Sequence, residues 1–304
     1  MRVLYNGKWD GIWDRPKYQQ MREKILDSFK GLVFVEEGHK YYLNGNEITC
    51  VSNVTHLFQE HFDAPTKARE TFERNFNNPD SKYYRMTAEE IEEAWRLNSK
   101  QACEHGTERH EFAESCFYYM TRQYDKILPE FKDRLTEDGG FLAIQPKEEA
   151  AVRFYEDMPV CVVPILAETK VYDEELGYSG TFDLLCYYDA ELEGKPASRS
   201  GLMVLDWKTN KDLYKNFAGK TLLPPFNGLL DMPISLYKLQ LSLYQNCLEK
   251  IGMKVVARRI MWLRPSGEYD KISLEPYVVK LREALTEHIE TIKKTLVNEY
   301  ARKD

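Results

Sequence analysis

The chain has 304 residues, of which 43% are hydrophobic and 30% charged, so its length suits one large globular domain or two small ones. The formal net charge of −7 argues against a generally basic nucleic-acid-binding protein, although it leaves room for a local basic groove. No apolar run approaches the roughly 18 residues of a membrane span, and the N-terminal sequence MRVLYNGKWDGIW lacks the pattern of a signal peptide. We therefore expect a protein of the cytoplasm that has no membrane partner.

The cysteines are scattered and form no CxxC pair, so a zinc or iron–sulfur site is not expected. We interpret them as the reduced thiols of a cytosolic protein. They are Cys50, Cys103, Cys116, Cys161, Cys186 and Cys247.

The first half of the chain is predicted to be mainly helical. Residues 1–30 form an extension that ends in a short helix, and residues 32–54 predict two short strands around EEGHK followed by an Asn-Gly turn. Residues 64–134 are charged and mostly helical. Within them, Thr87 and Glu90 form a capping box that opens one helix, and the helical pattern resumes at TERHEF.

The character of the sequence changes near residue 160, where β-branched and aromatic residues become frequent. Three strands are predicted first, and then a long amphipathic helix, one more strand and a final helix. This order predicts an α/β or α+β core. The segments are 160–173, 178–189, 201–209, 234–252, 255–264 and 278–303.

We divide the chain into three regions that form one integrated domain. Residues 1–63 are an N-terminal extension with short strands and a helix. Residues 64–158 are a helical region, and residues 159–304 hold the core sheet and the C-terminal helices.

The stretch VLDWKTNK, residues 204–211, ends a buried strand in opposite charges. Asp206 and Lys208 share one face of that strand, because side chains alternate. If the preceding strand is a neighbour, Asp183 comes close to Asp206, and a divalent cation such as Mg²⁺ or Mn²⁺ would relieve the repulsion between the two carboxylates. The alternative is an ordinary strand-end ion pair at the surface of the sheet.

Two further groups are candidates for the same site. Gly106, His110 and Glu114 fall on one face of a predicted helix, and the glycine would permit close approach of another element. Glu168 ends an apolar strand and could orient Lys208 or a metal-bound water. His110 could equally be a core or surface histidine, and Glu168 could be an exposed charge or pair with Lys170.

Taken together, the motifs resemble the PD-(D/E)xK nuclease superfamily, in its RecB-like and mitochondrial genome maintenance exonuclease branch. HGTERHEFAE is similar to the G-T-x-x-H-x-x-x-E helix, and AETKVYDEELGYSGTFDLL is similar to the E…G-x-x-D block. VLDWKT resembles the D-x-K-T block, and QLSLYQ resembles the Q-x-x-x-Y helix. The segment HKYYLNGNEITCVSNVT resembles the opening of phage and mitochondrial members. The likeness spans residues 39–250.

The resemblance implies a restriction-endonuclease-like α/β core, with a small mixed central sheet flanked by helices and an N-terminal helical region. It makes Lys208 the catalytic lysine, with Glu168 an auxiliary acid and Glu114 a further acid beside the site. The implied ligands of a Mg²⁺ or Mn²⁺ ion are His110, Asp183, Asp206 and the carbonyl of Trp207. The implied substrate-binding residues are Thr209, Lys211, Gln240 and Tyr244.

This sequence departs from the family pattern at three points. Its second acid is an aspartate instead of a glutamate, and the loop after Asp183 carries the insertion DAELEGKPASRSG. Nothing after Cys247 could supply the four-cysteine cluster of some relatives.

The implied activity is a metal-dependent DNA exonuclease that prefers single-stranded ends, acting in replication, repair or recombination. Lysines 211, 215 and 220, with Tyr214 and Phe217 between them, could follow a single strand, or they could form a solvated loop. A structure-specific endonuclease and a non-catalytic nucleic-acid-binding module are the alternatives. A phage-encoded protein would act in the host cytoplasm, and the acidic net charge leaves open that a protein partner delivers the DNA.

Overall fold

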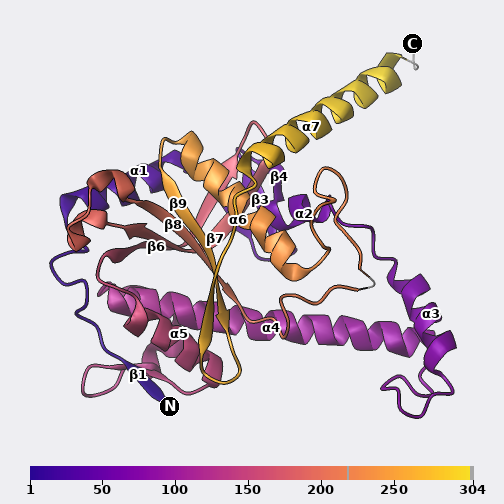
Figure 1. Ribbon diagram of the computed structural model, residues 1–304, viewed down its shortest axis with the longest axis horizontal. Coiled ribbons are helices and arrows are strands. Elements are labelled where there is room, and N and C mark those ends of the chain that lie inside the picture. The colour runs from indigo at the N-terminus through magenta and orange to yellow at the C-terminus, as the bar shows by residue number, and fades with distance from the viewer. Residues whose placement is uncertain (218, 302–304) are drawn as a thin grey trace.

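The computed structural model describes residues 1–217 and 219–301, with side chains described up to residue 290. Its centre is a mixed sheet of eight strands in the order β10-β9-β8-β7-β4-β3-β2, with β6 paired to β7 (Figure 1). The strands of this sheet are β2 (Leu32–Val35), β3 (Lys40–Leu43), β4 (Asn46–Cys50), β6 (Val162–Asp173), β7 (Tyr178–Tyr188), β8 (Gly201–Lys208), β9 (Val255–Leu263) and β10 (Tyr269–Ser273).

The helices cover both faces of this sheet, so the α/β class is correct. The α-helices are α1 (Pro16–Ser28), α2 (Val51–His56), α3 (Ala64–Asn75), α4 (Ala88–Met120), α5 (Pro146–Asp157), α6 (Pro233–Lys250) and α7 (Val278–Ala301). Two short strands, β1 (Arg2–Leu4) and β5 (Phe141–Ala143), form a separate ribbon. No helix in the described part of the chain is long and apolar enough to cross a membrane.

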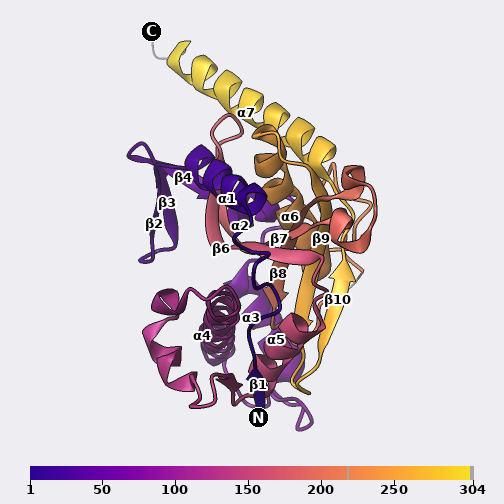
Figure 2. The same ribbon diagram turned by 90° about the vertical axis from the view of Figure 1, so that its left-hand side faces the viewer.

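The sheet is larger than the small one expected, because the N-terminal strands belong to it. β4 pairs in parallel with β7 at Thr49–Tyr178 and Cys50–Ser179, a long-range contact that local sequence patterns do not show. Figure 2 shows the β2–β3 hairpin extending away from the body of the molecule. The predicted N-terminal extension is therefore partly a continuation of the central sheet.

The strand β7 is the centre of the fold because three strands pair with it. β6 runs antiparallel along one edge of β7 from Tyr178 to Tyr188. β8 and β4 must share the other edge, where β8 pairs with Leu184–Tyr188 and β4 pairs with Tyr178 and Ser179. The two strands therefore diverge along residues 180–183, and this opening in the sheet contains Asp183.

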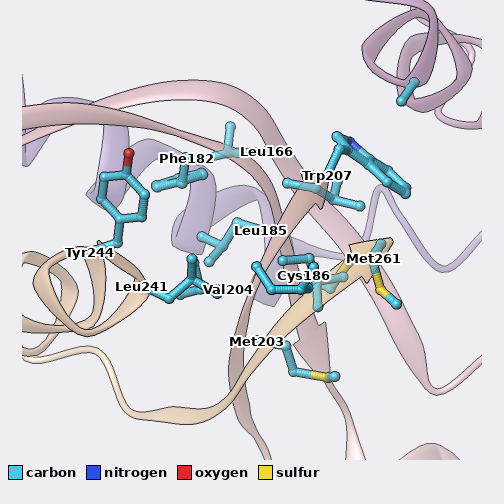
Figure 3. Packing of buried hydrophobic residues seen from close by; sticks show 14 of the residues in the cluster. Leu166, Phe182, Leu185, Cys186, Met203, Val204, Trp207, Leu241, Tyr244 and Met261 are labelled. Atoms are coloured by element: carbon cyan, nitrogen blue, oxygen red, sulfur yellow. The ribbon is translucent and has the colours of Figure 1, made fainter. Parts of the chain in front are cut away.

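Successive side chains of β8 point to opposite faces of the sheet, and each face is covered by a layer of helices. Val204 faces Leu241 and Tyr244 of α6, whereas Met203 and Trp207 point to the opposite side (Figure 3). On that side, the Trp207 ring packs edge-on against Phe154 of α5, with ring centroids 4.8 Å apart. Trp207 is 1% exposed, so a buried aromatic contact with α5 fixes the position of the end of β8.

The helix α4 is continuous over 33 residues, whereas the sequence suggested two helical segments. The predicted capping box is present, with both the Thr87 and the Glu90 side chains bonded to backbone. Gly106 does not break the helix because the following turns are packed against the core, where Phe112, Ala113 and Cys116 are fully buried. The first half of α4 is mostly exposed and lies beside α3, to one side of the sheet (Figure 1).

Candidate functional site

Three carboxylates lie in one row across three neighbouring strands. The β7–β8 register runs from Tyr188–Gly201 to Leu184–Leu205, and its next step places Asp183 opposite Asp206. The β6–β7 register in the same way places Glu168 opposite Asp183, between the pairs Ala167–Leu184 and Thr169–Phe182. The predicted proximity of Asp183 and Asp206 is therefore confirmed, and Glu168 extends the row.

His110 approaches this row from α4. Its Nδ1 atom lies 3.3 Å from Oδ2 of Asp183. One ligand atom from each of His110, Glu168 and Asp183 lies within 4.8 Å of the others, which is close enough for all three to contact one cation. The packing of α4 on β6 and β7 thus places His110, from the predicted helical region, beside the three carboxylates of the sheet.

Asp183 is held by the strand beside it. Its Oδ2 accepts a hydrogen bond of 2.7 Å from the backbone N–H of Trp207. Burial opposes ionisation of this carboxyl, but His110, Lys208 and the Trp207 N–H outweigh it and lower the pKa of Asp183. The side chain is therefore an anion with a fixed orientation.

Asp206 is the most deeply buried of the three acids, with 1% of its surface exposed. Its Oδ2 forms an ion pair with Lys208, but Oδ1 has no hydrogen-bond partner. Burial and the nearby charge of Asp183 raise the pKa of Asp206 to about 6. A buried carboxylate oxygen without a partner is costly, and a bound cation would satisfy it.

Lys208 lies at the end of β8 on the same face as Asp206. Burial opposes its charge, but Asp206 and Asp183 outweigh that effect and raise the pKa of the ammonium, so it is protonated at neutral pH. The ammonium also lies 4.4 Å from the centre of the Tyr237 ring on α6. The lysine therefore has both an anionic partner and an aromatic face that restrict its position.

Glu168 occupies a strained backbone conformation, with φ of 42° in the middle of β6. Non-glycine residues rarely adopt the left-handed region, and such strain is concentrated at functional sites. Burial, together with the charges of Asp183 and Glu114, raises the pKa of Glu168 well above its ordinary value. The predicted alternative, a pair with Lys170, is not present: Lys170 is exposed and forms no ion pair with Glu168 among the described side chains.

Glu114 lies one helical turn after His110 and is half-buried. It accepts a hydrogen bond of 2.8 Å from the hydroxyl of Tyr118. Burial raises the pKa of Glu114, and the charge of Glu111 adds to this effect. Its charge in turn contributes to the raised pKa of Glu168, so the two side chains lie in one electrostatic environment.

The predicted substrate-binding residues fall into two groups. Thr209 and Lys211 follow β8 directly, and Lys211 is exposed. A Cβ on Gly106 would lie 3.6 Å from Oγ1 of Thr209, which is an ordinary contact distance. A larger side chain would therefore fit at position 106. The prediction that another element approaches Gly106 is confirmed, because Gly106 faces Thr209. The Thr209 carbonyl accepts a hydrogen bond of 2.7 Å from Lys147 of α5.

Gln240 and Tyr244 form the second group, on α6. Gln240 donates a hydrogen bond of 3.3 Å to the Tyr244 hydroxyl, and Tyr244 is 3% exposed. A Cβ on Gly180 would lie 2.9 Å from the Tyr244 ring, so only glycine lets this ring pack against β7 where the sheet opens. Tyr244 therefore supports the wall of the site from inside the protein.

Sequence reasoning missed Tyr237 and Asn210. The Tyr237 hydroxyl donates a hydrogen bond of 3.0 Å to the Asn210 side chain, which ties α6 to the segment after β8. The helical spacing could have predicted the position of Tyr237. Tyr237, Gln240 and Tyr244 are three and then four residues apart, so they share one face of α6. That face is turned toward the end of β8.

The donors present fit a hard divalent cation, since carboxylate oxygens and one imidazole nitrogen are suitable ligands for Mn²⁺ or Mg²⁺. His110, Glu168 and Asp183 lie within reach of one ion, and Asp206 adds a free oxygen in the same row. The Trp207 carbonyl, which the resemblance implies as a ligand, belongs to the residue whose N–H binds Asp183. No protein-family model matches the chain, and no curated protein sequence matches it.

Proposed function

We propose that the protein is a metal-dependent nuclease that hydrolyses phosphodiester bonds in DNA from an end. The observation that carries the proposal is the row of Glu168, Asp183 and Asp206, with His110 above it and Lys208 beside it. We further infer that β6–β9 form a restriction-endonuclease-like core of the PD-(D/E)xK type. This inference rests on the motifs in the sequence and on their meeting in one place.

The carboxylates and His110 would hold Mg²⁺ or Mn²⁺, which supplies a nucleophilic water and neutralises charge on the phosphate. The chain's own contribution is made by Lys208. Its side chain retains 13% exposure, so the ammonium is accessible to a phosphate oxygen of a bound substrate. A protonated lysine there would stabilise the negative charge that develops as the bond to phosphorus forms.

Surface side chains beside the site support a nucleic-acid substrate. Lys211 and Lys215 are exposed, as are Tyr214 at 53% and Phe217 at 67%. Exposed aromatic rings between cations provide stacking and phosphate contacts for a single strand without sequence preference. Lys220 is instead ion-paired with Glu60, so it contributes less to such a surface than the sequence alone suggests.

Two observations favour an exonuclease over an endonuclease. The described part of the chain contains no separate sequence-reading domain, and the first half of α4 is exposed beside α3. That pair of helices would limit access to the site to a strand end. The intact set of His110, Asp183, Asp206 and Lys208 favours an enzyme over a module that only binds.

The test is degradation of end-labelled linear single-stranded and double-stranded DNA beside a closed circle. Each substrate is incubated with Mg²⁺, Mn²⁺ or EDTA, using the wild type, Lys208→Ala and the matched control Lys30→Ala. Lys30 is 73% exposed and lies outside the site, so its loss should leave the rate unchanged. Lys208→Ala should lower the rate by two orders of magnitude or more.

The outcomes distinguish an exonuclease from an endonuclease and from a non-catalytic binding module. Loss of linear DNA alone, dependent on metal and on Lys208, supports the exonuclease and reveals its strand preference. Cutting of the circle makes the protein an endonuclease. Binding of DNA without cutting under any metal condition overturns the proposed chemistry and leaves a binding module.

A further inference from the structure

A pocket lies on the opposite face of the sheet from the candidate nuclease site. It has a volume of about 490 Å³ and is bounded by the end of α5, the segment after β7, and strands β8, β9 and β10. Its floor is apolar and consists of Met203, Leu205, Ala257 and Met261. This size is in the range of sites that bind small molecules or a few residues of a peptide.

Strand geometry separates this pocket from Asp206 and Lys208. Met203 and Leu205 alternate along β8 with Val204 and Asp206, so they face the opposite side. Figure 3 shows Met203 and Met261 on the far side of the strands from Tyr244 and Leu241. A ligand in the pocket would therefore leave the nuclease site open.

The charges around the pocket are unbalanced. Arg259, Arg199 and Lys271 line it. Within the part of the chain whose side chains are described, the side chains of these three residues make no hydrogen bond or ion pair. The Nε atom of Arg259 is buried without a partner. Lys271 lies opposite Met261 in the β9–β10 register, so it is a diagonal neighbour of Arg259 on the same face.

The acids of the pocket are already engaged by other groups. Glu193 forms an ion pair with Lys195 and accepts a hydrogen bond of 2.8 Å from Tyr188. Asp157 accepts a hydrogen bond of 3.1 Å from Tyr269, and this neutral donor leaves the carboxylate charged. Arg199, Arg259 and Lys271 nevertheless outnumber this one carboxylate. In a chain with a net charge of −7, this pocket therefore has free positive charge and is complementary to an anion.

The floor limits which anion can bind. A nucleobase carries several donors and acceptors, and a floor of Met, Leu and Ala side chains would leave them without partners. An aliphatic or aromatic side chain suits this floor. Cations from three separate elements, η4 (Ala197–Arg199), β9 and β10, suit several carboxylates better than one.

We propose that this pocket binds a short acidic peptide segment of a partner protein. An apolar side chain of the peptide rests on Met203, Leu205 and Met261, and its carboxylates contact Arg259, Arg199 and Lys271. The proposal does not depend on the nuclease activity, because it concerns the opposite face of the sheet.

The test is fluorescence polarisation with a labelled pool of hexapeptides in which Asp alternates with Leu, Ile or Phe. The full chain is used at low salt. A pool with Lys in place of Asp controls for nonspecific adhesion. The double variant Arg199→Gln/Lys271→Gln removes exposed charges that have no folded-state partner, so it should fold normally, which a thermal melt checks. Lys30→Gln/Lys132→Gln is the matched control outside the pocket.

The proposal predicts saturable binding of the acidic pool, no binding of the lysine pool, and a roughly tenfold or larger loss of affinity in Arg199→Gln/Lys271→Gln. Binding should also weaken as salt increases, and Lys208→Ala should leave it unchanged. The proposal is overturned if the wild type does not bind the acidic pool, if the double variant binds as the wild type does, or if dTMP displaces the peptide at lower concentration than unlabelled peptide does.

Discussion

The ammonium of Lys208 lies 4.4 Å from the centre of the Tyr237 ring, while its other partner is the buried carboxylate of Asp206. The aromatic face and the carboxylate together restrict the position of a lysine side chain that is otherwise long and flexible. Tyr237 is therefore a positioning residue: it acts through Lys208.

Replacing Tyr237 with Leu should slow DNA hydrolysis five- to thirtyfold, because a desolvated cation–π contact is worth about 1–2 kcal/mol. Tyr237→Phe keeps the ring and loses only the hydrogen bond to Asn210, so it should retain most of the activity. The measurement is the initial rate at saturating and at limiting DNA. Equal loss in the Leu and Phe variants would mean that the hydroxyl, and not the ring, is important.

Gly180 is a position where space requires glycine. Gly180→Ala would place a Cβ 2.9 Å from Tyr244, and the displaced ring should lower the free energy of unfolding by about 1–3 kcal/mol. Gly228→Ala is the matched control, since a Cβ there meets nothing within 4 Å. Urea unfolding measures both variants, and equal stability of the two would contradict the packing described for Tyr244.

The buried Asp206 makes the metal-free protein sensitive to pH. Burial and the charge of Asp183 raise the pKa of Asp206 from 3.8 to about 6, so the folded state holds a proton that the unfolded state has released. The contribution of Asp206 to stability therefore falls as pH rises from about 4 to about 6. At pH above this range the carboxylate is charged and destabilises the fold.

Asp206→Asn should consequently stabilise the metal-free protein at pH 8 by about 1–3 kcal/mol, and this gain should shrink toward pH 5. Urea unfolding in EDTA at several pH values measures the gain. The same variant should lose DNA hydrolysis, and added Mn²⁺ should stabilise it less than the wild type, because His110, Glu168 and Asp183 still lie within reach of one ion. A variant less stable than the wild type at pH 8 would show that the ion pair with Lys208 outweighs the cost of burial.

A separate polar contact fixes α1 on the core. The hydroxyl of Tyr18 donates a hydrogen bond to the fully buried carboxylate of Asp189, which also pairs with Lys17. Tyr18→Phe should lower the free energy of unfolding by about 1.5–3 kcal/mol, the usual range for a hydrogen bond to a charged group. Tyr42→Phe, on the β2–β3 hairpin, is the control, and an equal effect in the two variants would argue against this role for Tyr18.

Much of the core was predictable from local sequence. The apolar segments near residues 160–208 formed strands as expected, because β-branched and aromatic residues favour a buried sheet. The capping box at Thr87 and the proximity of Asp183 and Asp206 are also confirmed. These features depend on residues close in sequence or on adjacent strands, which periodicity can detect.

Other features depend on tertiary contacts that no local pattern contains. The parallel pairing of β4 with β7 joins Thr49 to Tyr178, and it enlarged the sheet beyond the prediction. The left-handed backbone of Glu168 has no local cause in the sequence, since glutamate does not favour it. The contact of Tyr237 with Lys208 required knowing how α6 rests on β8.

The central claim is that the acidic row with His110 holds the divalent cation on which hydrolysis depends. Its most direct test is an anomalous difference map from crystals of the protein grown with Mn²⁺. We predict a peak coordinated by side chains of His110, Asp183 and at least one of Glu168 and Asp206, which is absent from crystals of Asp183→Asn. Manganese bound elsewhere with this cluster empty, or no bound manganese at all, would contradict the account.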